Sequence, residues 1–101
     1  MIYKIWVDDI RRPPDKSFIW FTTVNEVKTF IERTETEGIH KIGLLDLDHD
    51  AGVYGPPDYI KILDWLEETG RKFPIRIHSM NPVGRENMRR VIHRNGWKEI
   101  Q

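Results

Sequence analysis

Five aspartates lie in two short parts of the sequence: Asp8 and Asp9, and then Asp46, Asp48 and Asp50. Two carboxylates about 4 Å apart repel each other by about 1 kcal/mol in water and about 4 kcal/mol at an effective dielectric constant of 20. If these carboxylates converge, protons, arginines or a divalent cation must neutralise them. Oxygen ligands in a chain without cysteine favour Mg²⁺ or Mn²⁺.

We therefore predict a divalent metal site, Mg or Mn, with Asp8, Asp9, Asp48 and Asp50 as its ligands. The alternative is a set of solvated loop carboxylates and turn caps. Asp46 lies inside an apolar run and is equally well explained as a buried, hydrogen-bonded residue, so we leave it out of the ligand set.

Two histidines flank the acidic residues, His49 directly after Asp48 and His78 farther along the chain. Imidazole has an unperturbed pKa of about 6.5, which suits proton transfer near neutrality. We predict that His49 and His78 are catalytic, together with Asp48; the alternative is that both histidines are structural. His40 and His93 have no such neighbours and are interpreted as surface residues.

Ser79 to Arg85 read Ser-Met-Asn-Pro-Val-Gly-Arg, which is typical of a strand followed by a helix. The free N–H groups of a helix N-terminus bind phosphate readily. We predict that Ser79, Asn81 and Arg85 bind a phosphorylated substrate, aided by Arg11 and Arg12. Ordinary capping of the helix by Asn81 is compatible with this role.

A strip of arginines on the last predicted helix, formed by Arg85, Arg89, Arg90 and Arg94, has two interpretations. It could follow an RNA backbone, or it could be a solvated helix face. We favour the solvated face.

Strands and helices alternate along the chain. Apolar, β-rich runs predict strands over 3–8, 18–22, 42–48, 74–79 and 97–100. Helices are predicted to begin at Thr23, where Glu26 completes a capping box, at Asp58, and at Asn81. Pro13 and Pro14 exclude a helix between the first two strands.

This pattern predicts an α/β fold in which helices flank a single, mostly parallel five-stranded sheet. The expected order is 2-1-3-4-5, as in receiver and flavodoxin folds, with the first helix replaced by a loop. Ligands of such sheets bind at the carboxyl ends of the strands, next to the switch point between strands one and three. Asp8, Asp48 and His78 all follow strands, so the fold predicts that they meet.

Length and composition limit the alternatives. The 101 residues suit one domain, 1–101, and 39% hydrophobic residues with four tryptophans can form a core. Sixteen basic and sixteen acidic residues cancel, which argues against a general nucleic-acid-coating or membrane-surface protein. No apolar run reaches the roughly 20 residues of a membrane span, and no signal peptide is recognisable, so we expect a cytoplasmic protein.

Three segments together resemble the cyclic-phosphate-processing receiver domain family. They are residues 7–14 (VDDIRRPP), residues 47–50 (LDHD) and residues 78–88 (HSMNPVGRENM). The resemblance implies a receiver-like fold. It also implies that Asp8, Asp9 and Asp48 form the acidic pocket, with Asp48 at the phosphoacceptor position and Ser79 at the conserved hydroxyl position.

The family is associated with processing cyclic phosphates of RNA ends or nucleotides. By this resemblance we expect a metal-dependent phosphoesterase that opens a 2′,3′-cyclic phosphate on an RNA end or a phosphorylated small molecule. A receiver-like module that binds such a ligand without turnover is the alternative. A phosphorelay receiver is less compatible, because the lysine of signalling receivers has no clear equivalent and the two histidines are foreign to them.

Overall fold

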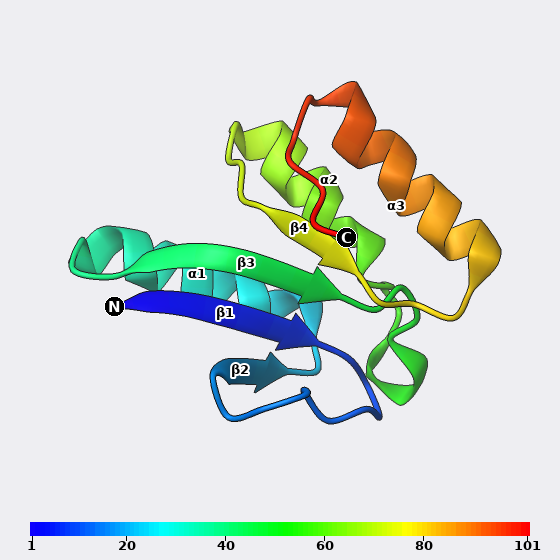
Figure 1. The fold of residues 1–101 in the computed structure, drawn as a ribbon, viewed down its shortest axis with the longest axis horizontal. Helices are drawn as coiled ribbons and strands as arrows, with labels where there is room; N and C mark the ends of the chain where they lie inside the picture. Colours follow the sequence, from blue (N-terminus) through cyan, green and yellow to red (C-terminus); the bar gives the residue numbers. More distant parts are fainter.

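The strands of the chain form one parallel sheet in the order β2-β1-β3-β4. The computed structural model describes residues 1–101 (Figure 1). The strands are β1 (Ile2–Val7), β2 (Phe18–Phe21), β3 (Lys41–Leu47) and β4 (Ile75–Ile77). The helices are α1 (Val24–Glu37), α2 (Ile60–Thr69) and α3 (Pro82–Arg94), with a 3₁₀ turn, η1 (Gly52–Tyr54), between β3 and α2.

The predicted α/β fold with a parallel, receiver-like sheet is confirmed, but the fifth strand is wrong. Residues after α3 make only an isolated parallel bridge, between Ile75 and Glu99. The physical reason is the length of β4, which spans three residues instead of the predicted 74–79. Its free edge therefore pairs with a single residue of the following segment.

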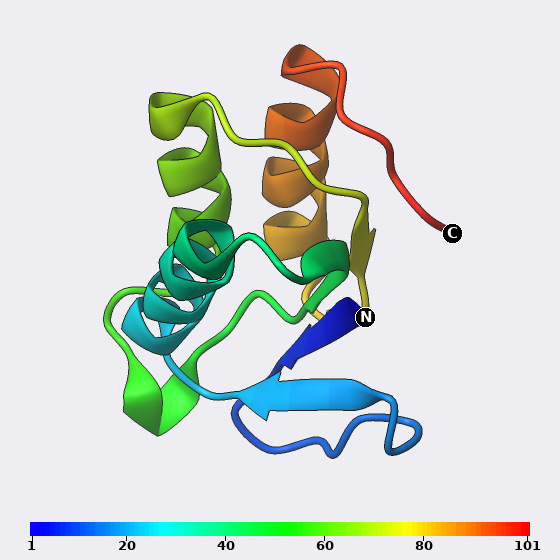
Figure 2. The same ribbon diagram turned by 90° about the vertical axis from the view of Figure 1, so that its left-hand side faces the viewer.

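All three helices lie on one face of the sheet (Figures 1 and 2). Each strand–helix–strand crossover moves in the same direction, from β2 past β1 to β3 and then outward to β4. Strand–helix–strand crossovers are right-handed, so crossovers that run in the same direction across a sheet place their helices on the same face of it. The connection from β1 to β2 moves the other way, and as predicted it contains no helix. The opposite face is therefore left without a helical layer.

The hydrophobic core lies between the sheet and this helical layer. Alternate side chains of the strands point into it, and each helix contributes one apolar stripe. Fully burying a large aliphatic side chain contributes about 1.5–3 kcal/mol. The core includes Ile5, Val7, Leu45, Leu47, Ile75, Ile77, Val27, Ile31, Leu63, Leu66, Met88 and Ile92.

The predicted helix starts are correct for α1 and α3 and wrong for α2. Thr23 and Glu26 form the expected capping box of α1, and Asn81 caps α3. Helix α2 begins at Ile60 and not at Asp58, because the Asp58 carboxylate instead accepts a hydrogen bond from the backbone N–H of Ala51 (3.0 Å). No helix in the structure has the length and apolar character that crossing a membrane requires.

Candidate functional site

Three carboxylates meet at the carboxyl ends of β1 and β3. Asp8, Asp9 and Asp48 each offer an oxygen atom, and these atoms lie within 4.8 Å of one another. The parallel pairing of β1 and β3 causes this approach, since it continues past the strands through a hydrogen bond from the N–H of Asp48 to the carbonyl of Val7 (2.9 Å). The predicted convergence of these acids is what the fold produces.

Asp8 is buried and fully engaged. Its Oδ1 accepts hydrogen bonds from the backbone N–H groups of Ile10 (2.9 Å) and Arg11 (2.8 Å), and its Oδ2 lies 2.9 Å from Nε2 of His78. Burial alone would raise the pKa of Asp8, but the hydrogen bonds from Ile10, Arg11 and His78 outweigh it and leave the pKa below its usual value. Asp8 is therefore held as a carboxylate.

The pKa of Asp9 shifts in the opposite direction to that of Asp8. Burial, followed by the neighbouring charges of Asp8 and Asp48, raises the pKa of Asp9 above its usual value. Gly52 gives this side chain its space, because a Cβ atom there would lie 2.3 Å from Oδ2 of Asp9. No lysine, arginine or histidine forms an ion pair with Asp9 or Asp48, and the oxygen donor set fits a hard divalent cation.

His78 lies between two buried carboxylates. Its Nδ1 is 2.7 Å from Oδ1 of Asp46, and its Nε2 contacts Asp8. The ring stacks on Trp6, with centroids 3.8 Å apart and planes 4° from parallel. Each nitrogen of the ring therefore faces one carboxylate oxygen.

The site also contains Asp46, for which the interpretation as a buried, hydrogen-bonded residue is correct, and Trp6, which sequence reasoning missed. Asp46 is completely buried, and its Oδ2 has no hydrogen-bond partner. The alternation of strand residues placed Asp46 on the same face as Asp48, which is the signal that could have identified it. Trp6 lies opposite Asp46 in the register of β1 and β3, and a sequence without strand register gives no sign of that neighbour.

His49 lies in a second, more exposed group with Asp50 and Asp58. Its Nδ1 is 2.7 Å from Oδ1 of Asp50, and Asn81 donates to the same oxygen (3.2 Å). The hydrogen bond with His49, more than the one from Asn81, lowers the pKa of Asp50. Asp50, predicted as a ligand, therefore lies outside the group formed by Asp8, Asp9 and Asp48.

The first turn of α3 packs against the His49 ring. A Cβ atom on Gly84 would lie 2.4 Å from that ring, so glycine permits the contact. The Asn81 side chain accepts a hydrogen bond from the N–H of Gly84 (3.0 Å), which is the predicted capping interaction. The buried Ser79 hydroxyl accepts from the N–H of Asn81 (3.1 Å), and Arg85 donates to the carbonyl of Ser79 (3.1 Å).

The two arginines after the acidic pair differ in position. Arg11 donates to the carbonyl of His78 (3.4 Å), and its Nε lies 4.0 Å from Oδ2 of Asp8. Arg12 is exposed and forms no hydrogen bond or ion pair. Only Arg11 is thus placed at the edge of the site.

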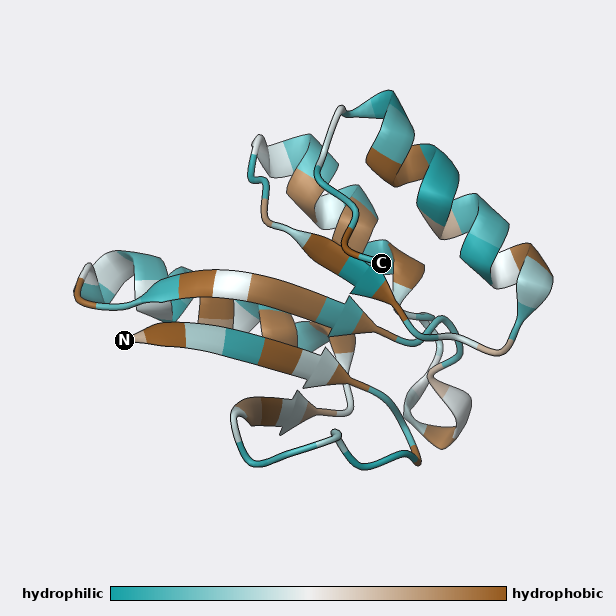
Figure 3. Ribbon diagram, in the orientation of Figure 1, coloured by the Kyte–Doolittle hydropathy of each residue, from teal (hydrophilic) through white to brown (hydrophobic).

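The arginine strip of α3 is largely paired. Arg89 contacts Glu99 (3.0 Å), Arg94 contacts Glu67 (2.9 Å), and Arg90 lies 3.9 Å from Glu86. Figure 3 shows the outer side of this helix as mostly hydrophilic. The strip therefore fits the solvated-face interpretation.

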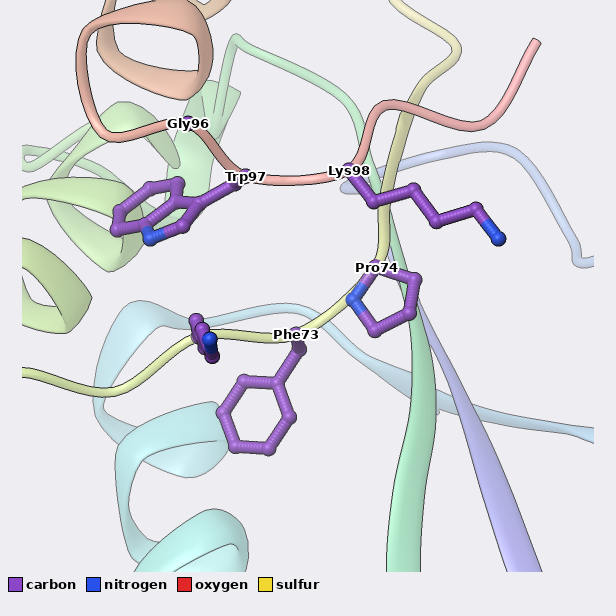
Figure 4. A pocket seen from close by; sticks show the side chains of 6 residues that line it. Phe73, Pro74, Gly96, Trp97 and Lys98 are labelled. Carbon is purple, nitrogen blue, oxygen red and sulfur yellow. The ribbon is translucent and has the colours of Figure 1, made fainter.

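A pocket of about 310 Å³ lies elsewhere, at the amino end of β4 (Figure 4). Its lining combines two aromatic rings with two lysines and comprises Lys72, Phe73, Pro74, Gly96, Trp97 and Lys98. It does not include any residue of the acidic site, which lies at the other end of the strands.

The family comparison covers most of the chain. A family model described as the cyclic-phosphate processing receiver domain matches residues 3–94, which include every predicted site residue. Searches among curated proteins and among solved structures gave no significant match. Since the family match spans most of its length, the chain belongs to the cyclic-phosphate processing receiver domain family.

Proposed function

We propose that this domain is a metal-dependent phosphoesterase that opens a 2′,3′-cyclic phosphate on an RNA end or a nucleotide. The observation that carries the proposal is the hydrogen-bonded series Asp46–His78–Asp8, in which both carboxylates are buried and Asp8 adjoins the carboxylates of Asp9 and Asp48. An ionisable group between two buried carboxylates is weak evidence for a stabilising role, because the cost of removing charges from water offsets their attraction.

Asp8, Asp9 and Asp48 would hold Mg²⁺ or Mn²⁺. A divalent cation supplies Lewis-acid chemistry, which stabilises negative charge on phosphoryl oxygens. Asp8 is fixed for this role, because two backbone N–H groups and His78 hold its carboxylate in place. A cation would stabilise the ionised form of Asp9 most, since burial and the charges of Asp8 and Asp48 raise the pKa of this carboxyl.

His49 would transfer a proton from the attacking water to the ribose oxygen that leaves. Asp50 holds Nδ1 of the ring, which leaves Nε2 without a partner in the protein. In the reaction the oxygen of a water forms a bond to phosphorus, and the bond from phosphorus to one ribose oxygen breaks. His49 takes the proton of the water and returns it to that ribose oxygen. In this scheme His78 orients Asp8 and does not itself touch the substrate.

Ser79, Asn81 and Arg85 would position the phosphoryl group at the first turn of α3. The N-terminus of the helix carries partial positive charge, and Val83 has the free N–H group of this turn, because Pro82 has none and those of Gly84 and Arg85 donate to Asn81. Arg85 keeps donors available beyond the nitrogen that it uses on backbone carbonyls, and Arg11 lies on the other side of the acids.

A binding module without turnover is the second candidate. The observation that favours it is the engagement of both His78 nitrogens with carboxylates, which removes one of the two histidines predicted for proton transfer and leaves His49 alone to act as both base and acid. Such a module would be stabilised by Mg²⁺ and phosphate compounds and would release no product.

Incubation with 2′,3′-cyclic nucleotides and with RNA ending in a cyclic phosphate distinguishes the two. We expect a phosphomonoester product by chromatography only with Mg²⁺ or Mn²⁺. Asp48→Asn should abolish turnover, and His49→Ala should lower it about 10²- to 10⁴-fold while Mg²⁺ still raises the melting temperature. Asp64→Asn, on the outer side of α2, is the matched control. Absence of product on all substrates would contradict the phosphoesterase, and full activity of His49→Ala would contradict the role of that residue.

A further inference from the structure

One face of the sheet carries no helix, and its side chains form a defined surface. The strand register places together the residues that point away from the helices, because paired residues of parallel strands share a face. We call this surface the open face, and it consists of Lys4, Trp6, Phe18, Trp20, Leu44, Asp46 and Arg76. In Figure 1 helix α1 lies behind β1 and β3, so the opposite face of these two strands is turned toward the viewer.

Aromatic rings make up one side of the open face. Trp20 lies on the edge strand β2 and is 39% exposed. Its indole N–H donates to the backbone carbonyl of Asp8 (2.8 Å), which fixes the ring. Phe18 is half-buried, and it packs edge-on against Trp6 with centroids 5.7 Å apart. Trp20 and Phe18 therefore form a rigid pair of rings beside the acidic site.

The charges on the open face are positive. The Lys4 ammonium lies 4.3 Å from the centre of the Phe18 ring. Arg76 is exposed and forms no hydrogen bond or ion pair. The only acid of the face, Asp46, is completely buried and bonded to His78. A partner therefore meets aromatic rings and two cations, of which the Arg76 guanidinium has no acidic partner, whereas Lys4 lies near the exposed Asp15.

We infer that the open face binds single-stranded RNA, with bases stacked on Trp20 and Phe18 and phosphates near Lys4 and Arg76. Aromatic side chains combined with positive charge are the surface that single strands require. The face spans three inter-strand spacings of about 4.8 Å, or room for about four stacked bases at 3.4 Å each.

The direction in which the RNA lies on the open face rests on the proposed function, whereas the binding of RNA does not. Trp20 is hydrogen-bonded to the backbone of Asp8, and Trp6 stacks on His78. With a cyclic phosphate as the substrate, an RNA on the open face would therefore have its 3′ end at the acidic site. The surface would select RNA ends over free cyclic nucleotides as the substrate of that site.

The test is fluorescence anisotropy with a labelled RNA octamer that ends in a 3′-hydroxyl, so that no turnover is needed. We expect Trp20→Ala to weaken binding about tenfold, and Trp20→Phe to keep most of the affinity. Arg76→Ala, which removes an exposed side chain and should not affect folding, should reduce the salt slope by about 0.7. Arg90→Ala, on the helical side, is the matched control and should bind like the wild type.

Three outcomes would overturn the inference. The first is no binding by the wild type at about 0.1 mM, the weak end of non-specific affinities. The second is equal weakening by Arg76→Ala and Arg90→Ala. The third is self-association of the wild type, seen by sedimentation velocity and lost in Trp20→Ala, without RNA binding; that result would make the open face a contact between two copies. Because the octamer lacks a cyclic phosphate, RNA binding and catalysis can fail separately.

Discussion

The two histidines of the site lie at the ends of neighbouring strands, yet their surroundings differ. His78 is bonded at both nitrogens to buried carboxylates and covered by Trp6. His49 is bonded at one nitrogen, to the exposed Asp50. A buried ion pair is costly to break because one charge is left without a partner, whereas an exposed pair contributes little. The two side chains are about equally exposed, 11% for His78 and 13% for His49, so the difference lies in their carboxylate partners.

The largest expected effect comes from removing one carboxylate at each histidine. Asp46→Ala removes a completely buried carboxylate and leaves His78 with one partner, and we expect a loss of about 3 kcal/mol in the free energy of unfolding. Asp50→Ala should cost less than about 1 kcal/mol. Urea unfolding of both variants measures the difference. Equal losses would show that the burial of the carboxylate does not determine how much each pair contributes to stability.

A smaller effect should follow from filling the space beside His49. In Gly84→Ala the added methyl group meets the imidazole ring, which must move. We expect a loss of about 1–3 kcal/mol in the free energy of unfolding, as for other overpacked sites, together with reduced turnover. Asn87→Ala, in the next turn of α3, is the control. Unchanged turnover and stability in Gly84→Ala would mean that the position of the His49 ring is not restricted.

The pH dependence of stability should distinguish Asp8 from Asp9. The pKa of Asp8 is lowered in the folded state, so its carboxylate stabilises the fold above the unperturbed pKa of about 3.9, and that gain is lost as the pH falls through the folded-state value. Asp8→Asn should therefore lower the melting temperature at pH 7, with a difference from wild type that shrinks in acid.

The pKa of Asp9 is raised instead, so ionisation of this group opposes folding, and the penalty grows as the pH rises from about 4 through the folded-state pKa. Asp9→Asn should raise the melting temperature of the metal-free protein at pH 7 and have no effect below about pH 4. Calorimetry from pH 3 to 8 measures both variants. Shifts of the same sign at pH 7 would contradict the different environments of these neighbours.

Much of this arrangement could be predicted from the sequence because it depends on local signals. Asp8, Asp9 and Asp48 follow apolar runs that are typical of buried strands, and parallel strands bring such ends together. Asn81 and Pro82 mark the start of α3 in the same local way. The family resemblance was confirmed over residues 3–94.

The remaining features depend on contacts between distant segments. The pairing of Trp6 with Asp46, and of Asp46 with Arg76, follows from strand register, which no local pattern determines. The failure of residues 97–100 to form a strand depends on the short edge of β4. The one-sided helical layer is different, because the handedness of crossovers applied to the order 2-1-3-4 would have predicted it.

Diffraction from crystals soaked in Mn²⁺ tests the central claim most directly, because the anomalous signal locates the cation. The account predicts one peak bounded by the carboxylates of Asp8, Asp9 and Asp48, next to His78, and its loss in Asp48→Asn. A peak at His49, Asp50 and Asp58 instead, or no peak beside well-ordered carboxylates, would contradict it.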